Sequence, residues 1–105
     1  SNACVSRAID YISENIDNDL SLDSIADALF VNKYYLSHVF KETTNTSPHR
    51  YILKKRLVLA KQLLEKGQPA TEVYSKCGFS DYTHFFRAFK NEYGITPKQF
   101  VKSLR

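Results

Sequence analysis

One short segment of this chain occurs in two similar copies. NTSPHRY at residues 45–51 returns as GITPKQF at residues 94–100, 49 residues later in a chain of 105. Both copies place Ser or Thr directly before Pro, an order that caps a helix and opens its first turn. The repeat therefore predicts a small unit that is built twice, with about 50 residues for each copy.

The spacing of apolar residues is helical along the whole chain, and no segment alternates with the period of two that a strand requires. Only three Gly and three Pro interrupt it. These patterns predict an all-α fold of seven helices. The expected ranges are 4–16, a short helix after Ser21, 33–43, 48–66, 70–77, 81–92 and a last helix opened by Thr96-Pro97.

Capping residues mark the predicted boundaries. Ser21, Asn32 and Ser47 are expected N-caps, and either Ser80 or Asp81 opens the sixth helix. Asn45 and Gly67 suit the left-handed conformation that ends a helix. The expected inward residues include Ile12, Ile25, Leu29, Leu36, Val39, Phe40, Leu57, Leu64, Val73, Cys77, Phe85, Ala88, Phe89, Phe100 and Leu104, while Lys54, Lys55 and Lys61 lie on the outer face of the long helix.

The same pattern predicts the organisation of the chain. We expect residues 1–3 to be a cloning remnant and residues 4–47 to form the first unit with its N-terminal helix. Residues 48–66 are then a linker helix, and residues 67–105 form the second unit. We also expect the chain to be one part of a longer protein.

Charge is divided unequally along the sequence. Residues 1–48 hold three basic and seven acidic side chains, a formal charge of −4, whereas residues 49–105 hold twelve basic and four acidic, a charge of +8. Such asymmetry favours a polyanionic partner on one side of the molecule. The acidic residues Asp10, Glu14, Asp17 and Asp19 then face solvent, RNA polymerase or the remainder of the protein.

Each predicted copy contains two short helices joined by a tight turn, which is a helix-turn-helix. The second helix of such a pair fits the major groove of B-DNA, about 12 Å wide. Small helix pairs also occur that do nothing but pack. The outer faces of the third and sixth helices favour binding, because they combine aromatic, hydrogen-bonding and cationic groups, and exposed aromatic rings are unfavourable in water without a partner.

The segment GFSDYTHFFRAFKNEYGITPKQF at residues 78–100 resembles the signature of the AraC/XylS-type transcription regulators, in particular their C-terminal DNA-binding domain. The first half, YYLSHVFKETTNTSPHRYI at residues 34–52, is similar to the family's first unit, and residues 56–64 resemble its linker helix. The resemblance implies a homeodomain-like tandem, two helix-turn-helix units whose recognition helices enter adjacent major-groove segments about 34 Å apart. Three departures are Phe30, Asn45 and Tyr74, where the family usually has smaller residues or Gly.

Positions on the two recognition helices indicate which residues read base edges. Arg87 has the clearest preference, a bidentate pair with guanine, and Phe86 suits a thymine methyl group. His38 can donate or accept a hydrogen bond when neutral. The expected base-reading residues are Tyr34, Ser37 and His38 in the first unit and Tyr82, Thr83, Phe86 and Arg87 in the second.

A second set is expected near phosphates, where it adds affinity without sequence information. It comprises Lys33, Lys41 and Lys90, together with the helix starts at Asn32, Ser80 and Thr96, whose N–H groups can face an anion. Lys90 has an alternative structural role, in which its stem covers the core. Arg87 has an alternative as a phosphate contact.

Other functions fit the sequence less well. We do not expect an enzyme or a bound cofactor, and no Gly-rich phosphate loop is present. We also expect no metal site, because the spacing of His38, His49, His84 and Cys77 matches no zinc motif. No apolar run is long enough for a membrane span. A helical protein-interaction module is the main alternative to double-stranded DNA binding, and RNA is disfavoured because helices read its major groove poorly. The expected setting is the bacterial cytoplasm, at the nucleoid.

Overall fold

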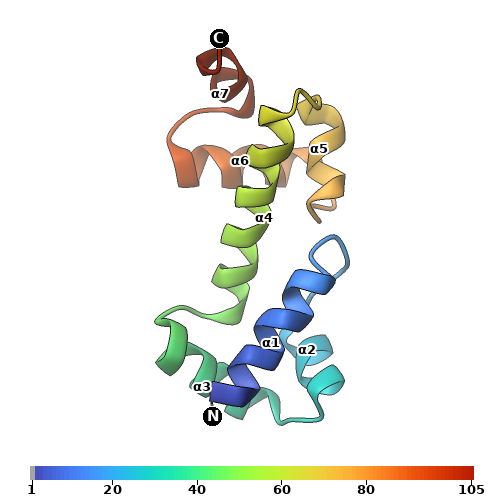
Figure 1. Cartoon of the computed structure of the whole chain (residues 1–105), viewed down its shortest axis with the longest axis vertical. Coiled ribbons are helices and arrows are strands. Elements are labelled where there is room, and N and C mark those ends of the chain that lie inside the picture. The colour runs from blue at the N-terminus through green and yellow to red at the C-terminus, as the bar shows by residue number, and fades with distance from the viewer. Residues whose placement is uncertain (1) are drawn as a thin grey trace. The chain divides into compact units, whose positions relative to one another are not determined.

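The computed structural model describes residues 2–105, and every regular element in that range is an α-helix, as predicted. None of these helices is long and apolar enough to cross a membrane. The helices are α1 (Asn2–Glu14), α2 (Leu22–Leu29), α3 (Lys33–Thr44), α4 (Pro48–Glu65), α5 (Ala70–Lys76), α6 (Tyr82–Tyr93) and α7 (Pro97–Ser103) (Figure 1).

The chain divides into two compact units, residues 1–52 and residues 53–105. Each unit has its own buried apolar cluster, the first built on α1, α2 and α3 and the second on α5 and α6. The helix α4 supplies Ile52 to the first cluster and Leu57, Ala60 and Leu64 to the second. The sequence repeat thus corresponds to two cores of similar composition.

Aromatic rings fill the centre of both cores. In the first unit Phe40 is fully buried and meets Tyr51 edge-on at 5.3 Å between ring centroids. In the second, Phe89 is fully buried and lies 5.8 Å from Phe85 and 4.8 Å from Tyr93. The expected inward positions Leu36, Phe40, Phe85 and Phe89 are all confirmed as buried.

Three expectations about helix ends and faces were wrong. The first helix runs from Asn2 to Glu14 instead of 4–16. Leu104 is 46% exposed because α7 ends one residue before it. Lys61 is half-buried and turns inward, with its Nζ 4.6 Å from the ring centroid of Tyr93, where the aromatic face attracts the ammonium group.

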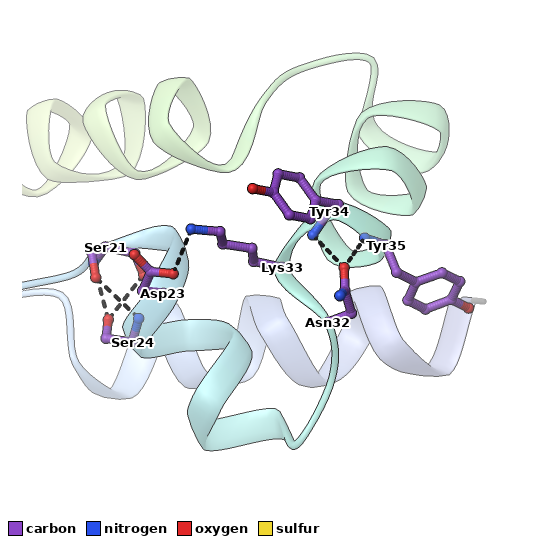
Figure 2. Close-up of polar contacts among 7 residues, drawn as sticks. All are labelled: Ser21, Asp23, Ser24, Asn32, Lys33, Tyr34 and Tyr35. Carbon is purple, nitrogen blue, oxygen red and sulfur yellow. Dashed lines mark hydrogen bonds and ion pairs between the residues drawn. The ribbon is translucent and has the colours of Figure 1, made fainter.

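The predicted caps are confirmed where their hydrogen bonds are resolved. Ser21 and Ser24 form a reciprocal capping box at the start of α2, and the Asn32 side chain accepts from the backbone N–H groups of Tyr34 and Tyr35 (Figure 2). Thr96 and Gln99 form a second capping box at the start of α7. These bonds satisfy backbone donors that a helix end otherwise leaves unpaired.

The turn inside each helix pair needs one residue with positive φ. In the second unit Gly78 takes φ +97° and the next N–H, of Phe79, bonds to the carbonyl of Tyr74. In the first unit the equivalent bond joins Val31 to Ala26, and the left-handed residue is Phe30 with φ 57°. A Phe side chain is strained in this conformation, whereas Gly is not.

The departure at Tyr74 is accommodated at the edge of the second core. Its side chain is half-buried and packs edge-on against Tyr82 at 5.8 Å between centroids. Tyr74 therefore reaches from α5 to the start of α6.

Substituting Phe30 tests the strain at the first turn. Phe30→Gly is expected to raise the free energy of unfolding by about 1 kcal/mol, because Gly adopts the left-handed conformation without a Cβ clash. Its side chain is 94% exposed, so removing the ring costs no packing. Phe30→Ala keeps the Cβ and should change stability little. Equal effects of the two substitutions in urea unfolding would contradict this account.

The cap of α6 gives a second test. Asp81 is the N-cap, and its Oδ1 accepts from the His84 N–H at 2.7 Å. Asp81→Ala should therefore lower the free energy of unfolding by about 1 kcal/mol. Ser80→Ala, one residue earlier, should leave it unchanged. If Ser80→Ala lowered the free energy of unfolding more than Asp81→Ala in thermal unfolding, Ser80 and not Asp81 would be the cap.

Candidate nucleic-acid interface

Each unit presents a pair of short helices joined by a tight turn, α2 with α3 and α5 with α6. The second helix of each pair buries one face and exposes the other, since residues at i, i+3, i+4 and i+7 share a face. The exposed stripe of α3 consists of Tyr34, Ser37, His38 and Lys41, and that of α6 consists of Thr83, Phe86, Arg87 and Lys90. The two stripes match position by position at a separation of 49 residues.

The stripe on α3 carries the three residues predicted as base readers in the first unit. Tyr34 is 74% exposed, at the first turn of the helix. Ser37 is half-buried and lines a cavity of about 250 Å³ together with Ser21, Ser47 and His49. His38 is exposed, and its Nε2 lies 3.1 Å from Oε1 of Glu42, an ion pair when the imidazole is protonated.

The stripe on α6 places Thr83 and Arg87 in the open, with Phe86 half-buried between them. Tyr82, also predicted as a reader, lies at the border of the stripe. It is 36% exposed and its ring contacts those of Tyr74 and Phe85 at 5.8 and 5.9 Å between centroids. The rings of Tyr74 and Phe85 thus cover part of Tyr82.

The helix starts expected to face phosphates are engaged by their own caps. Asn32 accepts at 2.8 and 3.2 Å, and the Thr96 hydroxyl accepts from the Gln99 N–H at 3.1 Å. Ser80 is exposed, but the cap of α6 is the carboxylate of Asp81, a like charge for a phosphate. The start of α6 is therefore less favourable to anions than the sequence suggested.

The cations predicted at phosphates differ between the units. Lys33 forms an ion pair with Asp23 at 3.0 Å, and this hydrogen bond and charge raise the pKa of the Lys33 ammonium (Figure 2). Lys41 and Lys90 are exposed at the ends of their stripes. Within residues 53–105 there are eleven basic and four acidic residues, and within residues 1–52 four basic and seven acidic. The second unit is thus net +7 and the first net −3.

Two acidic residues that pair with α3, Asp23 on α2 and Glu42 on α3 itself, were not identified as part of the site from the sequence. Asp23 lies ten residues before Lys33 and on another helix, so no sequence pattern connects them. Glu42 follows His38 at i+4, a spacing that does signal a helical pair. Both carboxylates reduce the positive charge that α3 presents.

The remaining reactive groups belong to the packing. Cys77 is fully buried in the second core, and burial raises the pKa of its thiol to about 11. The exposed ring of His84 packs edge-on against Phe79 at 5.3 Å between centroids. Across residues 2–105, no three His, Cys, Asp or Glu side chains come together in a group that could hold a metal ion.

Comparison with known proteins agrees with this geometry. The helix-turn-helix domain family matches residues 25–103. A probable transcriptional regulator, LumQ of Photobacterium leiognathi, is 34% identical over 96 residues, which is 90% of this chain and 39% of LumQ. The chain therefore spans well under half of that relative.

Solved structures extend the similarity to the fold. A transcriptional regulator from Chromobacterium violaceum with an AraC-type DNA-binding domain superimposes with a TM-score of 0.89 at 31% identity, covering 98% of this chain and 93% of that one. The DNA-binding domain of AdpA, solved in complex with a target DNA, has a TM-score of 0.91 at 19% identity and shares the fold, with 96% and 92% covered. Together, the family match and the near-complete alignment with the Chromobacterium violaceum structure show that the chain belongs to the AraC-type helix-turn-helix DNA-binding domains.

Proposed function

We propose that this chain binds double-stranded DNA at specific sequences, with α3 and α6 each entering a major groove of one duplex. The observation that carries the proposal is the pair of matched stripes. Tyr34, Ser37 and His38 on α3 stand at the positions of Thr83, Phe86 and Arg87 on α6. Because the paired side chains differ in chemistry, the two helices read different bases, and the whole site is asymmetric.

The base-reading roles follow from the chemistry of each exposed group. Arg87 is exposed, and its guanidinium group has the fork geometry that pairs with guanine O6 and N7. Phe86 offers an apolar surface to a thymine methyl group, and Thr83 a hydroxyl to either kind of edge. Tyr34, Ser37 and His38 form the corresponding set of the first unit, and Tyr82 contributes through its hydroxyl edge.

Phosphate contacts supply affinity and register. Lys41 and Lys90 occupy the same position in the two stripes and are the strongest candidates. Asn32, Lys33, Ser80 and Thr96 complete the set, with Asp23 and Asp81 reducing what Lys33 and Ser80 can add. The charge of +7 on the second unit makes it the main source of non-specific attraction.

In the cell we place this domain within a regulator of bacterial transcription that acts at the nucleoid. We divide it functionally into a first reading unit at residues 4–47, a linker helix at 48–66 and a second reading unit at 67–105. The rest of the regulator supplies effector sensing or dimerisation. RNA polymerase is a further partner, for which the acidic residues Asp10, Glu14, Asp17 and Asp19 of the first unit offer a surface.

One observation favours a second candidate, a protein-interaction module. Phe30 is 94% exposed at the turn of the first helix pair, and a large apolar side chain in water favours a partner that covers it. This role predicts binding that polyanions and salt do not weaken.

Fluorescence anisotropy with a duplex separates these candidates. We expect Kd to rise by about 0.9 log units per phosphate contact for each log unit of salt. Arg87→Ala should lose about 1–3 kcal/mol of discrimination at one guanine. Lys90→Ala should instead weaken all sequences alike, and Lys102→Ala, an exposed control on α7, should change little. Failure of the unsubstituted chain to bind duplex DNA at low salt would favour the interaction module.

A further inference from the structure

An ion pair joins the two helices of the first unit at the start of its recognition helix. The Nζ of Lys33 lies 3.0 Å from Oδ1 of Asp23, and the Lys33 side chain runs from the start of α3 back to the first turn of α2 (Figure 2). The ammonium group also lies 5.5 Å from the ring centroid of Tyr34, a proposed base reader. The pair is therefore beside the reading surface.

The fold does not require this pair. The matching turn bonds, Val31 to Ala26 and Phe79 to Tyr74, set the separation of the first helices at 48 residues, one less than that of the stripes. The repeat therefore places Thr71, with Glu72 next to it, at the position of Asp23, and Tyr82 at that of Lys33. Thr71 and Tyr82 line an open cavity of about 350 Å³. The same helix pair is thus built once with the two charges and once without them. The Asp23 and Lys33 side chains are 70% and 39% exposed, and ion pairs so exposed stabilise a protein little.

The pair does matter to a polyanionic ligand. A carboxylate at 3.0 Å cancels the charge that Lys33 would offer to a phosphate, and it repels the phosphate itself. No charged side chain stands at the equivalent place in α6, where Tyr82 replaces Lys33. Within the described residues, Arg87 and Lys90 of α6 make no ion pair, whereas His38 of α3 faces Glu42.

We propose that Asp23 is a positioning residue for DNA binding, which holds the Lys33 ammonium against α2 and thereby limits the affinity of the first unit. This inference rests on the proposed function. As a consequence, the second unit supplies most of the electrostatic attraction to DNA. The first unit adds selection among DNA sequences through Tyr34, Ser37 and His38. The attenuation acts on every sequence alike, because a phosphate contact carries no base information.

The test compares Asp23→Asn with Asp10→Asn, which removes one exposed negative charge from α1 without touching Lys33. Anisotropy titrations use a selected target duplex and a random duplex over a range of salt. Asp23→Asn should tighten both by on the order of fivefold at 0.1 M salt. It should also steepen the slope of log Kd against log salt by about 0.9, the value of one added phosphate contact. Asp23→Glu, which keeps the charge, should restore the wild-type slope.

A Lys33→Met background shows whether the effect passes through Lys33. There, Asp23→Asn should have no more effect than Asp10→Asn. Thermal unfolding by circular dichroism distinguishes the positioning role from a structural role. In a structural role, Asp23→Asn would both lower Tm and weaken DNA binding. If the unsubstituted chain binds DNA, and Asp23→Asn and Asp10→Asn have the same Kd and the same salt slope as each other, this inference alone is overturned. No wild-type binding to either duplex at low salt would overturn the proposed function with it.

Discussion

Each helix pair of this protein depends on one residue held at positive φ between its two helices. Gly78 meets the requirement freely, and Phe30 meets it under strain, yet the next N–H makes the same hydrogen bond in both units. In the first unit Arg7 of α1 also donates to the carbonyl of Leu29, at the end of α2, at 3.1 Å. After the turn, the second helix of each pair buries Leu36 and Phe40 in the first unit, and Phe85 and Phe89 in the second. The matched stripe of each helix lies on the other side.

Features set by neighbours in sequence were predictable. Helix spacing identified the seven helices of residues 2–105, and Ser21, Asn32 and Thr96 were identified as caps, because a cap depends on side chains within about three residues of it. The repeat also predicted two similar units. The stripes on α3 and α6 followed directly, since the buried faces fix which residues remain exposed.

Features set by contacts between helices were not predictable in the same way. Lys61 was expected to face solvent, but Tyr93, 32 residues later and on another helix, provides the ring that draws it inward. The pair of Asp23 with Lys33 depends on how α2 packs against α3. The packing of Tyr82 against Tyr74 likewise removes part of a predicted reader from the surface. In each case the partner lies on another helix, where no local pattern marks it.

In the proposed function, one chain carries two different reading helices. Selection from a library of random duplexes at two salt concentrations tests it most directly. We expect enrichment of two dissimilar short motifs, separated by about one turn of DNA, or about 10 base pairs. The motif that depends on Arg87 should contain a guanine. Enrichment of one motif alone, or binding that is sensitive to salt and indifferent to sequence, would contradict the claim.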